Sequence, residues 1–252
     1  MLVDFEIVLM TALMMGGAGV IKGTIGFGLP LVAIALLTLV HPVESALAII
    51  SMPLIATNIK LALSGQNIWK TLVVHKLFIL AMVLGTIVRV GTITLVNADV
   101  ILVLLGGLVL FFSLLSVINI VAPLMNAGCF SEVGVGGAAG FFGGLTSSYG
   151  PLIALYLRAR NLTKDDFVST LCLIITIGAL TFSLTMGVFR FYTAEDFLLS
   201  VFACIPAFIG LYFGGKIRRR IDTRRFFRLV LAMVSLIGIH LIFKGLHIAP
   251  FG

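Results

Sequence analysis

The sequence GVIKGTIGFGLP, at residues 19–30, recurs in outline as GFFGGLTSSYGP at residues 140–151. Both stretches are rich in glycine, end in proline and lie within long apolar regions. Glycine lets the backbone leave helical geometry, whereas proline favours the first turn of a new helix. We therefore expect each stretch to break a helix, with a short helix starting near Pro30 in the first and near Pro151 in the second.

The similarity extends beyond the two breaks. AGVIKG at 18–23 aligns with AGFFGG at 139–144, and PLVA at 30–33 aligns with PLIA at 151–154 at the same offset. Farther along, the two halves share only the order of their apolar segments. Each half continues with a short helix and three long ones. We expect two repeats, residues 1–122 and 133–252, joined by a linker at 123–132.

The composition indicates a membrane protein. Hydrophobic residues make up 60% of the 252 residues and charged residues only 11%, against about 25% charged in a typical soluble domain. The apolar segments fall at 5–24, 26–40, 43–64, 71–96, 98–122, 133–147, 150–158, 164–189, 194–215 and 226–248. A full span needs about 20 apolar residues. Three segments are shorter and are expected to be partial or re-entrant helices: 26–40, 133–147 and 150–158.

The positions of the basic residues predict the orientation. Net charge is +7, and six of the 17 basic residues lie in one short loop at 216–225. Basic loops stay on the cytoplasmic side, so this loop, the loop at 158–164 and the region at 65–76 should be cytoplasmic. The turns at 41–42 and 97–99 contain no Lys or Arg and should face outward.

This topology places corresponding loops of the two repeats, 41–42 and 158–164, on opposite sides. The repeats would therefore be inverted, each with a broken or re-entrant helix hairpin followed by three transmembrane helices. Inverted repeats with broken helices are typical of secondary transporters, whose substrate sites lie near the midplane. The predicted fold is an all-α polytopic membrane protein of this kind.

The breaks are the predicted substrate-binding site. A helix N-terminus offers free N–H groups and a partial positive charge, both of which favour an anion. The alternative role of these glycines is close helix packing. We expect the glycines spaced four residues apart to pack against other helices, and the breaks to form the site. The candidates at the breaks are Gly23, Gly26, Gly28 and Gly150, with hydroxyl donors from Thr24, Thr146, Ser147 and Ser148.

Three further polar residues are candidates for binding substrate. Lys22 lies at the first break, and a charge inside a membrane is costly and usually functional; the alternative is a lysine that reaches an interface. Arg89 is either a second anion contact or the partner of a carbonyl at the outer interface. Asn58 hydrogen-bonds either the substrate or a neighbouring helix.

The twin Gly-rich breaks, and especially GPLIALYL at 150–157 before a charged loop, resemble the sulfite exporter TauE/SafE family of transmembrane permeases. The resemblance covers nearly the whole chain in length and hydropathy. It implies sulfite, sulfoacetate or another organosulfonate as substrate, mostly exported across a bacterial-type inner membrane. Two departures from the family pattern, Leu29 and Lys22, leave the substrate within this class open.

Other classes of function find less support in the sequence. All ten acidic residues fall at segment ends or in loops, so we expect no carboxylate proton relay within the membrane. A coupled proton would travel through His75 or with the substrate. No nucleotide-binding loop, metal cluster or nucleic-acid motif is present, so we expect no cofactor and no nucleic-acid partner. The expected partners are a small anion and the lipid bilayer, and a homo-oligomer is compatible. A passive anion channel and, with less support, an intramembrane enzyme remain the alternatives.

Overall fold

A computed structural model gives the fold of the chain, and its described residues form α-helices and connecting turns without strands. The prediction of an all-α protein is confirmed for this part of the chain. The structure describes residues 5–25, 28–63, 68–92, 99–100, 102–104, 106–107, 110–111, 114, 128–158, 160, 162–189, 191, 193–218, 232, 235–236 and 238–246.

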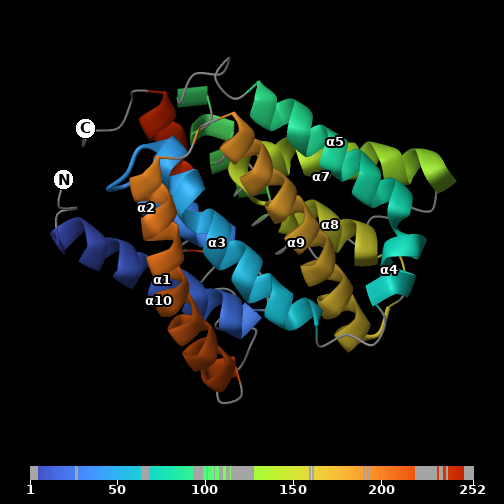
Figure 1. Cartoon of the computed structure of the whole chain (residues 1–252), viewed down its shortest axis with the longest axis horizontal. Coiled ribbons are helices and arrows are strands. Elements are labelled where there is room, and N and C mark those ends of the chain that lie inside the picture. Colours follow the sequence, from blue (N-terminus) through green and yellow to red (C-terminus); the bar gives the residue numbers. More distant parts are fainter. Residues whose placement is uncertain are drawn as a thin grey trace. The chain divides into compact units, whose positions relative to one another are not determined.

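The described residues form nine helices with defined bounds (Figure 1). They are α1 (Phe5–Ile25), α2 (Leu29–Leu37), α3 (Val43–Ala62), α4 (Ile68–Val74), α5 (Lys76–Gly91), α7 (Gly128–Thr146), α8 (Gly150–Arg158), α9 (Lys164–Val188) and α10 (Ala194–Arg218). Within the described residues, four stretches are long and apolar enough to cross a membrane: Glu6–Thr24, Val43–Ala62, Asp166–Val188 and Ala194–Ile217. The pair α4 and α5 passes the same test together and would add a fifth span.

The chain divides into two compact units. The first comprises Met1–Pro53, Thr94–Asn119 and Tyr192–Gly252, and the second comprises Leu54–Ile93 and Ile120–Phe191. Each unit groups segments that pack together, whereas the predicted repeats group segments by their order in the sequence. The inverted arrangement of the repeats and the domain boundaries therefore stay predictions.

In the first unit, α1 packs against α10 through small residues. A Cβ atom on Gly19 would collide with the backbone carbonyl of Ala207, and one on Gly23 would collide with the carbonyl of Leu211. Glycine thus allows the two backbones to approach closely, as is usual between membrane helices. Since both positions advance together along the two helices, α1 and α10 run in the same direction.

In the second unit, α5 and α7 lie side by side (Figure 1). They pack through glycines in the same way as α1 and α10. Gly136, Gly140 and Gly144 of α7 meet the backbone of α5 at Phe78, Met82 and Thr86 in turn. These two helices also run in the same direction. The sequence alignment pairs Gly140 with Gly19 and Gly144 with Gly23, so the aligned glycines make equivalent helix contacts in the two units.

Threonine caps fix the start of two long helices. Thr163 precedes α9, and its hydroxyl accepts from Asp166 N at 3.2 Å and donates to the Asp166 carboxylate at 2.7 Å. Thr193 and Asp196 repeat the arrangement at α10, at 3.0 and 2.6 Å. Such reciprocal bonds satisfy backbone donors that a helix start leaves free.

Two helix boundaries differ from the sequence-based expectation. The apolar segment at 71–96 was expected to be one helix, but α4 and α5 meet at His75 with a bend of 77°. Helix α7 begins at Gly128, inside the stretch expected to be a linker. Two long-range contacts accompany these differences, because the side chains of His75 and Glu132 both bond Tyr156 on α8.

Candidate functional site

The turn between α7 and α8 forms the best-defined candidate site. Helix α7 ends at Thr146, whose hydroxyl donates to the Phe142 carbonyl at 2.8 Å and accepts from Ser148 N at 3.3 Å. Ser147 follows in the left-handed region with φ of 54°, which costs a residue with a Cβ atom about 1–2 kcal/mol. Helix α8 then starts at Gly150 with Pro151 in its first turn. The turn therefore presents two serine hydroxyls beside a helix N-terminus.

These hydroxyls are buried. Ser147 is 0% and Ser148 3% exposed, and neither Oγ atom has a hydrogen-bond partner among the described residues. Leaving a polar group buried and unpaired costs about 1–3 kcal/mol. A ligand that accepts hydrogen bonds here would offset that cost.

Arg89 supplies the third buried polar atom without a partner. Its side chain is 4% exposed, and its Nε atom finds no acceptor in the described part of the chain. Its Nη1 atom lies 3.2 Å from the Thr92 hydroxyl and 3.4 Å from the Thr92 carbonyl, and its guanidinium lies 5.3 Å from the centre of the Phe141 ring. The carbonyl contact expected as one alternative is thus present, and one N–H group remains unused.

The turn at Thr146–Gly150, called the serine turn below, belongs to the same unit as Arg89. Gly144 links the two. A Cβ atom on Gly144 would lie 3.1 Å from the Arg89 Cβ atom, so the arginine backbone packs on the last turn of α7. Both serine hydroxyls and the guanidinium are donors, and a guanidinium cannot accept. The described donor set therefore suits an anion whose oxygen atoms only accept hydrogen bonds.

The first break lies in the other unit and is described in part. Lys22 is 1% exposed in the last turn of α1, and Thr24 donates to the Val20 carbonyl at 2.8 Å and lies 3.2 Å from the Gly214 carbonyl. Gly23 packs against α10, whereas Gly28 has a left-handed φ of 92° directly before α2. Gly26 lies outside the described residues.

Asn58 takes part in helix packing. It is buried in α3, and its Nδ2 atom donates to the Leu54 carbonyl at 2.8 Å. The side-chain amide thus bonds its own helix, one turn back. Its role as a substrate contact stays a prediction.

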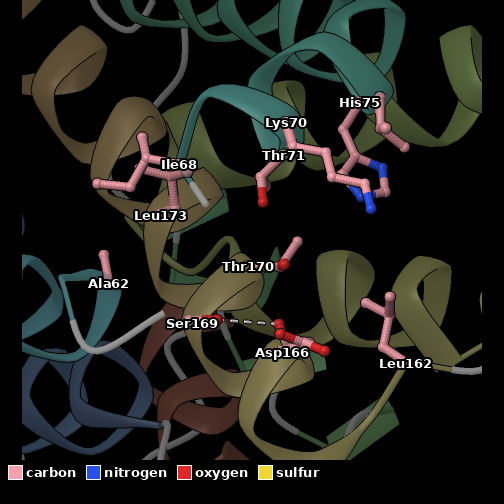
Figure 2. Close-up of a pocket in the computed structure, with 11 residues that line it drawn as sticks. Ala62, Ile68, Lys70, Thr71, His75, Leu162, Asp166, Ser169, Thr170 and Leu173 are labelled. Carbon is pink, nitrogen blue, oxygen red and sulfur yellow. Dashed lines mark hydrogen bonds between the residues drawn. The ribbon is translucent and has the colours of Figure 1, made fainter. Parts of the chain in front are cut away.

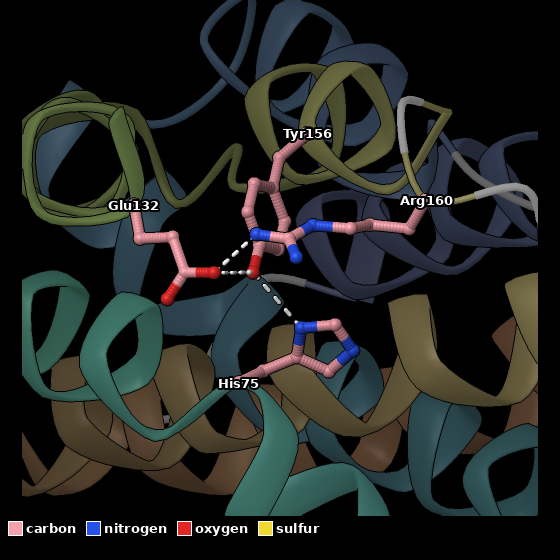
Figure 3. A network of polar contacts seen from close by, with 4 residues as sticks. All are labelled: His75, Glu132, Tyr156 and Arg160. Carbon is pink, nitrogen blue, oxygen red and sulfur yellow. Dashed lines mark hydrogen bonds and ion pairs between the residues drawn. The ribbon is translucent and has the colours of Figure 1, made fainter. Parts of the chain in front are cut away.

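The sequence analysis missed a polar network at the other end of α8 (Figure 3). His75 Nδ1 lies 2.9 Å from the Tyr156 hydroxyl, which donates to Glu132 Oε1 at 3.3 Å, and Arg160 forms an ion pair with the same carboxylate. Phe78 stacks on the Tyr156 ring with centroids 4.1 Å apart. The only signal in the sequence was a pair of polar residues, Tyr156 and Arg160, spaced one helical turn apart.

His75 also lines a cavity of about 430 Å³ beside α4 and α9. Figure 2 shows Lys70, Thr71 and His75 on one side of this cavity and Asp166, Ser169 and Thr170 across from them. Among the described residues, no group of His, Cys, Asp and Glu is arranged to hold a metal ion. The polar groups in the described lining are hydroxyls, the Lys70 ammonium, the Asp166 carboxylate and the His75 ring.

Comparison with known proteins identifies the family. The family model described as Sulfite exporter TauE/SafE matches residues 11–241. The same comparisons match the chain to no curated protein and to no solved structure. The matched region starts within α1, extends past α10, and contains the serine turn and the cavity. The chain is thus a multi-pass membrane transporter of sulfite or related anions, and it belongs to the sulfite exporter TauE/SafE family.

Proposed function

We propose that this protein is a secondary transporter that exports sulfite or an organosulfonate across the bacterial-type inner membrane. Its substrate binds at the Gly-rich helix breaks, and the turn at Thr146–Gly150 supplies the contacts that can be named atom by atom. The observation that carries the proposal is the set of three buried donors, Ser147 Oγ, Ser148 Oγ and Arg89 Nε, without partners among the described residues.

The chemistry of these donors matches a sulfur oxyanion. Sulfite and sulfonates present three oxygen atoms around one sulfur, so one anion can accept from several directions. The N-terminus of α8 adds a partial positive charge worth about 0.3–1 kcal/mol when exposed and up to about 2 kcal/mol when partly buried. The guanidinium adds a full charge, and charged donors make stronger hydrogen bonds than neutral ones.

Direct transport assays test the proposal. Purified protein in liposomes loaded with labelled sulfoacetate or sulfite should show saturable efflux, and the same anion on the other side should stimulate exchange. Carboxylates of equal size should compete more weakly. Flux that rises linearly with concentration and shows no exchange would favour a passive channel.

A matched pair of variants tests the site. Ser148→Ala should weaken sulfonate binding about tenfold, since one hydrogen bond to an anion is worth about 1.5 kcal/mol or more. It should leave stability unchanged or improved, because it removes a buried hydroxyl without a partner. The control is Ser51→Ala, whose hydroxyl is buried but already donates to the Ala48 carbonyl at 2.7 Å. Equal affinity in both variants would place the substrate elsewhere.

A further inference from the structure

We propose that the cavity beside α4 and α9 is a second anion-binding site, in which the anion binds together with a proton on His75. The inference rests on the proposed function, because it takes the transported sulfonate as the anion. It adds a site and a coupling ion that the serine turn does not provide.

The cavity has the size and lining of such a site. Its volume of about 430 Å³ lies within the range of small-molecule pockets, roughly 300–1,000 Å³. Lys70 lines it with a cation, and Thr71, Ser169 and Thr170 line it with hydroxyls. The Ser169 hydroxyl donates to the Asp166 carbonyl at 3.2 Å and can also accept.

Asp166 is the one carboxylate in the lining, and it is occupied. Its Oδ2 atom accepts from the Thr163 hydroxyl at 2.7 Å, and it lies in the first turn of α9. The positive end of a helix stabilises a carboxylate at this place. Capping of α9 thus explains why a carboxylate lies in the lining. Lys70 lies across the cavity from it (Figure 2).

The network in Figure 3 sets the tautomer of His75. Tyr156 uses its single hydroxyl proton to bond Glu132, so its oxygen can only accept from His75, and Nδ1 must carry a proton. A neutral His75 then has a lone pair on Nε2, which repels an anion. Protonation converts Nε2 into a charged donor.

Charged groups of both signs lie around His75. Lys70 on α4 and Arg160 after α8 oppose a positive ring, whereas Glu132 on α7 and Asp166 on α9 favour it, and Tyr156 on α8 accepts from it. An ordinary histidine titrates near pH 6.5. An anion in the cavity adds one further negative charge, so anion and proton should each strengthen binding of the other.

Helix α8 connects this site to the serine turn. Its first residue, Gly150, starts the helix beside Ser147 and Ser148, and Tyr156 near its end bonds His75. A change at His75 therefore acts on the same nine-residue helix that presents its N-terminus to the substrate. Through α8, protonation of His75 can thus influence the substrate site without an acidic residue within the membrane.

Calorimetry on the purified full chain tests the inference. The probe is methanesulfonate, because its charge stays fixed from pH 5.5 to 8, over which sulfite itself titrates. Binding heats in two amine buffers of different ionisation enthalpy give the protons taken up per anion, and sulfonate and phosphate buffers are avoided because they compete. For each anion that binds in the cavity we expect close to one proton taken up above pH 7, and an affinity of this site that rises about tenfold per pH unit as pH falls.

Two variants decide the outcome. His75→Gln should bind methanesulfonate with no proton uptake, and Tyr156→Phe, which keeps the stacked ring, should lower the uptake because Nε2 can then carry the proton of neutral His75. The control His41→Gln should match the parent. Uptake unchanged in His75→Gln, or absent in the parent, would overturn the inference. Sulfonate transport in liposomes would still stand in that case, and its absence alone would overturn the proposed function.

Discussion

The ring of Tyr149 lies where a side chain on Gly143 would be, because a Cβ atom on this glycine would collide with the ring. The same ring also meets Gly178 of α9, where an added Cβ atom would lie 2.9 Å from the ring. Two glycines thus hold a buried ring between α7 and α9. The ring fixes the turn at Ser147 and Ser148, since Tyr149 follows them directly.

This relationship predicts opposite effects for two substitutions in α7. Gly143→Ala should lower the free energy of unfolding by about 1–3 kcal/mol, the usual cost of overpacking a core. Gly137→Ala should leave it unchanged or raise it by up to about 1 kcal/mol, because nothing lies within 4 Å of the added Cβ atom and alanine favours helix. Unfolding by SDS titration in mixed micelles measures both. Equal stability in the two variants would show that the ring can move away freely.

The stability of the first unit should depend on His41. This residue lies in the turn between α2 and α3, where its Nε2 atom is 2.8 Å from the Thr11 hydroxyl. Burial lowers the pKa of His41, and the attraction of Asp196 only partly opposes this effect. The folded state therefore binds a proton less readily than the unfolded state. The stabilisation is fully present above about pH 6.5, the ordinary pKa of histidine, and is lost as pH falls below it.

His41→Gln should therefore flatten the fall in thermal stability between about pH 6.5 and 5. The expected difference is at most about 1.4 kcal/mol per pH unit. Since carboxylates also titrate toward the acid end, the informative quantity is the difference between parent and variant at each pH. Parallel curves would contradict the assignment.

The two breaks could be predicted because glycine and proline act locally. Helix α2 begins directly after the left-handed Gly28, and α8 begins at Gly150 before Pro151, both within a residue or two of the expected starts. The bend at His75 could not be predicted, because residues 71–96 contain no proline and appear as one apolar segment. It coincides with the contact to Tyr156, which lies 81 residues away in sequence.

The candidate site was predicted in part for the same reason. Thr146, Ser147 and Ser148 were found from the break itself, and Arg89 from its charge within an apolar segment. Their placement in one unit depends on the packing of α5 against α7 through Gly144, which composition alone does not specify. Glu132 was counted among acids at segment ends, and only the fold reveals its bonds to Tyr156 and Arg160.

Labelling of single cysteines tests the inverted topology. Lys76 and Glu195 lie at the start of α5 and α10 respectively, in the fourth apolar segment of each repeat, and both are exposed. If the repeats are inverted, Lys76→Cys should react only from the cytoplasmic side and Glu195→Cys only from the outside, in a background without the three native cysteines. Lys216→Cys, at the other end of α10, serves as the cytoplasmic control. Reaction of positions 76 and 195 from one side would exclude inversion.

Lys22 provides the test of the first break. The sequence alignment places Lys22 opposite Gly143 and Gly28 opposite Tyr149, so the large and small residues are exchanged between the two breaks. Lys22 is 1% exposed, and a buried lysine charge needs compensation by a partner or a bound anion. Lys60 and Lys76 are both exposed, so either can be neutralised without that cost.

We therefore expect Lys22→Ala to weaken sulfonate binding at least tenfold and Lys60→Ala and Lys76→Ala to change it less than twofold, consistent with about 1.4 kcal/mol or more for a buried charged contact. Lys22→Met separates charge from packing, because it keeps the length of the side chain and removes the ammonium group. Loss of binding in both Lys22 variants, with normal unfolding, indicates a role for the charge in binding. Lys22→Met could instead bind like the parent while Lys22→Ala unfolds early. Lys22 would then fill space in the first break as Tyr149 does in the second, and Arg89 would supply the positive charge that binds the anion.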